Sequence, residues 1–272
     1  NLPEENIGIV ENQGFEAQLS HGGRSKGRDF LYNLSGNFMY AKNKVIFMDE
    51  TPQPEGYEYL YLTGHPMGSE LYYQCIGINR TEEDLTKYPQ MAGSGLGDYI
   101  YADIDGNEKI DSKDMLRSDL NTIPQIVFGL TGNFQYKNFD LSILFQGQAL
   151  ARFHYTPLQA PLEGNITEEM ATQSWTLDRT DAKYGRINST NNRKESTMWL
   201  RNASFLRLKN LELGYNFSGK ALKSAGIKGL RLYIGGYNLF TITGLKELDP
   251  ETNNTATYPL MRVFNTGVKV TF

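Results

Sequence analysis

The sequence predicts an all-β fold: an antiparallel up-and-down meander of about seven strands that forms part of a large transmembrane β-barrel with long extracellular loops. Two observations lead to this fold class. Apolar and polar residues alternate with a period of two in several separate stretches. The connections between these stretches are alternately short and long, which is typical of barrels with brief turns at one end and long loops at the other.

The alternation is clearest at the carboxyl end of the chain. In Val263–Phe272, apolar residues such as Phe264 and Val268 alternate with polar ones such as Asn265 and Lys269. The same period recurs in Leu230–Ile234 and in Lys209–Phe217. Each stretch therefore predicts a strand with one apolar and one polar face, and together they predict a meander.

Upstream, the same pattern predicts four more strands. In the second of them, aromatic residues cluster at both ends of the apolar face, as they do where a strand crosses the two interfaces of a bilayer. Lys137-Asn138 separates two alternating runs and predicts a tight hairpin. The seven predicted strands lie at residues 7–20, 29–40, 126–136, 138–148, 204–217, 229–240 and 262–272.

The long connections are 41–125, 149–203 and 241–261. Successive connections of a meander lie at opposite ends of the sheet, so the sequence predicts all three long ones at the same end. A soluble sandwich, in which the apolar face points into a core, remains the alternative. Bacterial barrels close with an even number of strands, and an open sheet would leave unpaired edges in lipid. We therefore expect residues 1–272 to be the carboxyl-terminal part of a larger barrel.

Composition excludes several function classes. The single Cys75 cannot form an internal disulfide or a thiolate metal cage. Basic residues are scattered and the net charge is -4, so we expect no nucleic-acid partner. The three histidines, His21, His65 and His154, lie far apart without a recognisable catalytic arrangement. We expect no catalytic residues and no enzyme activity.

One loop has the spacing of a metal site. Hard cations such as calcium need six or more oxygen ligands, and loop positions 1, 3, 5, 7, 9 and 12 can wrap one ion. Position 6 is Glu108 where glycine is usual, and the bidentate glutamate of position 12 is replaced by an aspartate. The alternative is an acidic, solvated turn. The expected ligands are Asp103, Asp105, Asn107, Lys109, Asp111 and Asp114.

Aromatic residues of the long connections could stack on sugar rings or on a partner protein, although such residues also pack loops together. The candidates are Tyr99, Tyr101, Tyr155, Trp175, Tyr184 and Trp199. A second set lies at polar positions of the strands, where it would face the lumen. That set comprises Asn133, Gln135, Asp140, Ser142, Glu212, Asn216, Arg231 and Lys269.

Several short motifs, taken in order, resemble the SusC/RagA group of TonB-dependent outer-membrane transporters. The amino-terminal ones are Glu11-Asn12-Gln13-Gly14-Phe15-Glu16, Gly64-His65-Pro66-Met67-Gly68 and Gly97-Asp98 followed by Asp103-Ile104-Asp105-Gly106-Asn107. The carboxyl-terminal ones are Phe205-Leu206-Arg207-Leu208-Lys209, Asn238-Leu239-Phe240-Thr241, Leu248-Asp249-Pro250-Glu251 and the final Phe272.

This resemblance implies a 22-stranded barrel in the outer membrane of a Gram-negative cell, with an amino-terminal plug. It also implies a SusD-like surface lipoprotein as partner, coupling to the TonB energy-transducing complex through residues outside this chain, and import of glycans or peptides. Outer-membrane lipid would surround the barrel. A soluble calcium-binding β-rich surface module that binds glycan or protein is the alternative hypothesis.

Overall fold

The computed structural model describes residues 7–27, 29–155, 166–219, 222, 224, 226–246, 248–252 and 258–272. The chain divides into two compact units. Unit 1 comprises 1–12, 43–122 and 152–201, and unit 2 comprises 13–42, 123–151 and 202–272. Within the described residues, no helix is both long and apolar enough to cross a bilayer.

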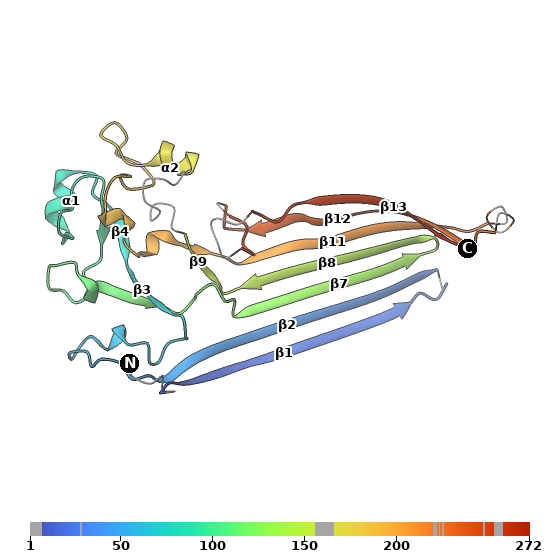
Figure 1. Cartoon of the computed structure of the whole chain (residues 1–272), viewed down its shortest axis with the longest axis horizontal. Helices are drawn as coiled ribbons and strands as arrows, with labels where there is room; N and C mark the ends of the chain where they lie inside the picture. The colour runs from blue at the N-terminus through green and yellow to red at the C-terminus, as the bar shows by residue number, and fades with distance from the viewer. Residues whose placement is uncertain are drawn as a thin grey trace, which may run out of the picture. The chain divides into compact units, whose positions relative to one another are not determined.

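One seven-stranded antiparallel sheet dominates the fold (Figure 1), with the strand order β1-β2-β7-β8-β11-β12-β13. Apart from the smaller strands that belong to unit 1, this is the order of the chain, so the sheet is a meander. The strands are β1 (Ile9–Arg24), β2 (Phe30–Phe47), β7 (Ile126–Tyr136), β8 (Phe139–Ala149), β11 (Phe205–Phe217), β12 (Gly229–Thr243) and β13 (Val263–Thr271).

The register places the long connections at one end of this sheet. At that end Tyr40 pairs with Ile126, and Ile126 pairs with Ala149. Phe205 pairs with both Gln148 and Thr243. At the other end Tyr136 pairs with Phe30 and Phe139. The short connections therefore share the second end, as the sequence predicts.

The strand bounds differ from the predicted ones in one main respect. The connection predicted at 41–125 begins too early, because β2 continues to Phe47. Pairing of β2 with β7 ends at Tyr40, and in Ala41–Phe47 beyond it Val45 donates to the His65 carbonyl and accepts from the Gly64 N–H, both at 2.8 Å. This part of the strand carries Lys42 and Lys44 where an apolar residue would continue the pattern, so the alternation disappears from the sequence although the strand does not. Similarly, β1 and β12 extend to Arg24 and Thr243.

The two faces of the sheet have opposite character. Leu141 lies beside Leu213, Leu213 beside Ile234 and Ile234 beside Thr266, so the apolar positions of β8, β11 and β12 form continuous rows. These side chains are not covered. Leu213 is 41% exposed, Ile234 60% and Val268 61%. In the part of the sheet that the structure describes, the apolar face is thus an outer surface rather than a core.

Unit 1 contains the densely packed core. It holds the two-stranded sheets β3 (Glu70–Tyr73) with β6 (Met115–Ser118), β4 (Cys75–Ile78) with β5 (Tyr99–Tyr101), and β9 (Arg152–His154) with β10 (Leu200–Asn202), whose last residue falls in unit 2. The helices are α1 (Glu82–Lys87), α2 (Glu168–Gln173) and the 3-10 turns Glu58–Leu60, Ser112–Asp114, Asn191–Arg193 and Thr197–Trp199. The antiparallel pairing of β4 with β5 shows that the connection predicted at 41–125 has strands of its own.

A charge on the apolar face tests its exposure to lipid. In the full-length protein, Leu213→Lys should lower the free energy of unfolding from a bilayer by about 2–4 kcal/mol, because a cation near the bilayer midplane loses its hydration. Asn133→Lys, on the polar face of β7, is the matched control and should cost less than about 1 kcal/mol. Denaturant titration in vesicles measures both. Equal costs for the two variants would contradict the assignment of the faces.

Candidate functional site

The polar face of the sheet carries an ion cluster built by three strands. Arg231 of β12 donates through Nε to Asp140 of β8 at 3.0 Å and through Nη2 to Glu212 of β11 at 2.8 Å. Nη2 also donates to the other oxygen, Oδ1, of Asp140. Asn216 donates at 2.7 Å to Oδ2 of Asp140, the oxygen that also accepts from Nε. All four residues belong to the set predicted to face the lumen, and the structure joins them into one network.

The cluster depends on a glycine. Gly214 lies between Glu212 and Asn216 on the polar face of β11, and a Cβ there would collide with the guanidinium of Arg231. The same guanidinium lies 5.1 Å from the ring centroid of Tyr233, a geometry suited to cation–π attraction. The absence of a side chain at 214 thus lets Arg231 lie flat across the sheet.

A second ion cluster fixes the connection between β12 and β13. Arg207 of β11 donates to Asp249 at 2.7 Å and to Glu251, and its Nε donates to Thr241 at 2.9 Å. Its side chain is only 2% exposed. Lys209 adds a contact of 3.0 Å to Glu251. We call Arg207, Lys209, Asp249 and Glu251 the loop clamp.

Both motifs of the loop clamp stand out in the sequence, but no local pattern pairs them. The basic pair lies in Phe205-Leu206-Arg207-Leu208-Lys209, and the acidic pair lies in Leu248-Asp249-Pro250-Glu251. The signal that could have predicted their pairing is the opposite charge of two motifs about 40 residues apart. A β-bulge at Lys209 also escaped prediction: the register shifts between Leu208 and Asn210, so that Arg207 and Lys209 both reach Glu251.

The predicted metal ligands are partly brought together. Asp103, Asp105 and Asp114 offer carboxylate oxygens within 4.8 Å of one another. Asp114 is fully buried and accepts hydrogen bonds of 2.8 Å from the backbone N–H groups of Ile104 and Asp111. The other three candidates, Asn107, Lys109 and Asp111, lie in the same loop but outside this group of carboxylates.

The backbone of this loop has the bend that a metal-wrapping loop requires. Glu108, at the position where glycine is usual, has a φ of 62°, and Gly106 has a φ of 73°. Burial alone would raise the pKa of Asp103. Hydrogen bonds from the backbone N–H groups of Glu108, Gly106 and Asn107 outweigh that effect and lower its pKa, so this carboxylate stays ionised.

The six candidate stacking aromatics are buried, which agrees with the packing of loops and not with stacking on a sugar or a partner, the two roles that the sequence leaves open. Tyr184 stacks on Trp199 with ring centroids 6.5 Å apart, and Tyr99 packs edge-on against the same indole at 6.0 Å. Their side chains instead form the core of unit 1. The relative exposures are 1% for Tyr99, 2% for Tyr101, 4% for Tyr155, 8% for Trp175, 1% for Tyr184 and 1% for Trp199.

Hydrogen bonds between polar groups inside this core join the two longest connections of the chain. The buried Asp98 receives two hydrogen bonds of 2.7 Å from Arg186. Asn192 accepts from the Tyr99 N–H at 2.7 Å and donates to the Gly97 carbonyl at 3.1 Å. Residues near 98 and residues 186–199 are therefore held as one folded body, unlike a pair of independent loops.

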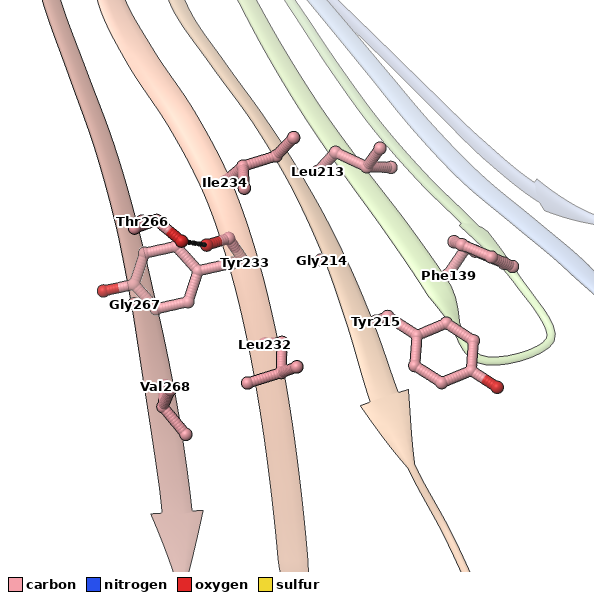
Figure 2. Close-up of a pocket in the computed structure, with 10 residues that line it drawn as sticks. All are labelled: Phe139, Leu213, Gly214, Tyr215, Leu232, Tyr233, Ile234, Thr266, Gly267 and Val268. Carbon is pink, nitrogen blue, oxygen red and sulfur yellow. Dashed lines mark hydrogen bonds between the residues drawn. The ribbon is translucent and has the colours of Figure 1, made fainter.

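The depressions of the sheet include some on its apolar face. Figure 2 shows one of about 430 Å³, lined by side chains such as Leu213, Leu232, Ile234 and Val268. Thr266 donates to the Tyr233 carbonyl at 3.1 Å, while the ring of Tyr233, which contacts Arg231, lies over Gly267 on the polar face. The apolar surface lacks the convergent polar groups that orient a soluble ligand, but it suits acyl chains.

Comparisons with known proteins agree with this architecture. Over 296 residues, 98% of the chain, the sequence is 27% identical to TonB-dependent receptor P3 of Formosa agariphila. It is 26% identical over 279 residues to TonB-dependent receptor SusC of Bacteroides thetaiotaomicron. Over 98% of its length the chain is thus similar to TonB-dependent receptors, SusC among them. The resemblance of the short motifs is thereby confirmed.

The fold agrees as well. The structure of the RagAB peptide transporter superimposes with a TM-score of 0.73 at 22% identity, covering 98% of this chain and 30% of that one. The chain spans 29% of the length of receptor P3 and 27% of SusC. No family model matches the sequence. TonB-dependent receptors of this group are outer-membrane β-barrel proteins, and the seven-stranded sheet is an open part of such a barrel in the outer membrane.

The loop clamp can be tested through the segment that it fixes. Arg207→Leu should leave Asp249 and Glu251 without their main partner, because breaking a buried ion pair costs about 3–5 kcal/mol. Amide hydrogen exchange of residues 248–252 in the full-length protein should then accelerate at least 100-fold. Arg262→Leu, an exposed arginine of the same connection, is the control. Unchanged exchange in Arg207→Leu would show that the clamp does not hold this segment.

Proposed function

We propose that the chain forms the carboxyl-terminal wall of an outer-membrane channel that imports nutrients by TonB-dependent opening of a plug. One observation carries the proposal: the sheet has a continuous exposed apolar face opposite a polar face on which Asp140, Glu212 and Arg231 pair across strands. Such a sheet can separate hydrocarbon from a hydrated lumen. Its relatives are named as TonB-dependent receptors, which supports the energy coupling.

The proposed partner is a SusD-like surface lipoprotein, and the proposed cargo is an oligosaccharide or a peptide. Support comes from SusC as a relative and from the RagAB peptide transporter as a structural neighbour. The densely packed unit 1, with its buried aromatics, gives the long connections a defined surface that a lipoprotein could meet. The channel works by positioning and opening rather than by bond chemistry, so no enzyme activity is proposed.

The soluble β-rich module is the less favoured candidate. A soluble sheet would cover Leu213, Ile234 and Val268 with a second layer, because burial of apolar surface is what stabilises such a domain. Among the described residues no such layer lies on this face, and these side chains remain exposed. The exposed face therefore favours a protein that is surrounded by lipid.

Uptake in cells tests the import function. Cells that lack the full-length receptor should lose at least nine-tenths of their uptake of labelled oligosaccharides or of labelled oligopeptides, and restoring the receptor should recover it. A protonophore should abolish the same uptake, because opening of the plug depends on TonB. The cargo whose uptake falls identifies the substrate class. Unchanged uptake of both classes, or uptake that resists the protonophore, would contradict the proposal.

We also propose that the loop 103–114 holds a calcium ion that stiffens this connection. Support comes from three converging carboxylates, of which Asp114 is buried, and from the left-handed backbone at Glu108. Calcium prefers carboxylate and carbonyl oxygens, and the carbonyl of Lys109 is at the loop position that usually supplies a backbone ligand. The alternative is a turn held by its own hydrogen bonds, such as that from Tyr57 to Asp105 at 2.9 Å.

Calcium titration followed by hydrogen exchange separates these alternatives. Calcium should slow exchange in residues 103–114 of the full-length protein, and Asp105→Asn should weaken the effect at least tenfold, since one ligand charge is lost. Glu82→Gln, an exposed acid of α1, should leave it unchanged. Glu108→Gly should raise the free energy of local opening by about 1 kcal/mol with or without calcium, because glycine adopts positive φ without strain. If calcium does not change the exchange rates of residues 103–114, the loop is the solvated turn and the calcium proposal is wrong.

A further inference from the structure

The short connections of the meander are unusually basic. Residues 21–29, 137–138 and 218–228 contain seven lysines and arginines and a single acidic residue, Asp29. The whole chain, in contrast, has 27 basic and 31 acidic residues. Unit 2 carries 14 basic and 7 acidic residues, and unit 1 carries 13 and 24. The positive charge of unit 2 is thus concentrated where the chain turns.

The register brings these turns to one rim of the sheet. Phe30 pairs with Tyr136, Phe139 pairs with Tyr215, and Phe217 pairs with Leu230. The β1–β2, β7–β8 and β11–β12 connections therefore follow one another along the same end (Figure 1). Four of their basic residues are described, and all four are exposed. They are Arg24, Lys26, Lys137 and Lys228, which we call the basic rim.

Three basic residues of β11 and β12 form ion pairs within the sheet and its connections, and none of the three belongs to the basic rim. Arg231 contacts Asp140 and Glu212, while Arg207 and Lys209 contact the acids of the loop clamp. The one acid near the basic rim, Asp29, accepts a hydrogen bond from the Lys137 N–H through its backbone carbonyl at 2.9 Å. Among the residues of this rim that the structure describes, four exposed cations accompany one acid, so the surface carries a net positive charge.

Aromatic side chains lie directly beside this surface. Tyr136 and Phe139 flank the β7–β8 turn and are 51% and 50% exposed, and Phe272 is 78% exposed. Lys137 Nζ lies 5.4 Å from the ring centroid of Tyr136. Aromatic rings on the apolar face mark the level of the headgroups, and lysines just beyond them reach the phosphates. The spacing therefore fits a lipid surface better than a free soluble anion.

We propose that the basic rim binds the phosphates of anionic phospholipids in the leaflet at the short-connection end of the barrel. The favoured lipid carries a net negative headgroup, such as phosphatidylglycerol, because a zwitterionic headgroup compensates its own phosphate. Each basic residue near a charged bilayer surface strengthens binding about fivefold at low salt. The inference goes beyond nutrient import, since it concerns the lipid around the barrel and holds whatever the channel carries.

Lipid titration of the detergent-purified full-length receptor, read by native mass spectrometry, tests the basic rim. Phosphatidylglycerol should bind the unsubstituted protein at least fivefold more tightly than phosphatidylcholine, and the preference should fall as salt is added. The variant Lys26→Gln, Lys137→Gln, Lys228→Gln should lose that preference. Its affinity for phosphatidylcholine should not change, which also reports that the barrel is still folded.

A matched variant controls for net charge. Lys87→Gln, Lys183→Gln, Lys194→Gln removes three exposed lysines of unit 1 and should keep the preference for phosphatidylglycerol. An equal loss in both variants would overturn the assignment to the basic rim, as would a preference that survives the rim substitutions. If the rim variant instead loses binding to isolated peptidoglycan while lipid binding is unchanged, a polymer occupies the rim and the lipid proposal is wrong.

Discussion

The structure depends on one constraint: the backbone hydrogen bonds of an unbroken antiparallel ladder fix the register, and the register decides which side chains share a face. In hydrocarbon an unpaired N–H or C=O costs several kcal/mol, so a spanning sheet must pair all of them. A slip of one residue would exchange the two faces of a strand. The row through Leu141, Leu213 and Ile234 continues to Phe134 and Tyr32 on one side and to Thr266 on the other, so the six strands from β2 to β13 keep the same alternation.

This shared alternation of the strands determines where the polar side chains meet. Asp140, Glu212 and Arg231 come from three strands and meet only because each occupies a polar position at the same level of the sheet. Gly214 provides the space through which the guanidinium crosses β11. The loop clamp uses the same face at the other end, where the bulge at Lys209 turns two basic side chains toward Asp249 and Glu251. Charge is thereby kept on the side away from lipid.

The sequence reveals the sheet well because a period of two survives in every strand that has lipid on one side. The sequence predicts the structure less well in segments that do not have lipid on one side. Ala41–Phe47 is a strand without an apolar row, because Lys42 and Lys44 take the outer positions, and it was therefore missed. The core of unit 1 was also missed: Trp199, Tyr184 and Tyr99 lie about 15 to 100 residues apart, and no local pattern shows that they pack together. The loop clamp and the ion cluster likewise join residues through long-range register.

Site-directed spin labelling along β11 of the full-length receptor in bilayers tests the assignment of the two faces most directly. Single cysteines at positions 210–216, with Cys75 replaced by serine, can be probed with lipid-soluble oxygen and a water-soluble nickel complex. Labels at Leu211, Leu213 and Tyr215 should be accessible to oxygen, and those at Asn210, Glu212 and Asn216 should not. The opposite phase, or oxygen access without a period of two, would contradict a sheet whose apolar face meets hydrocarbon.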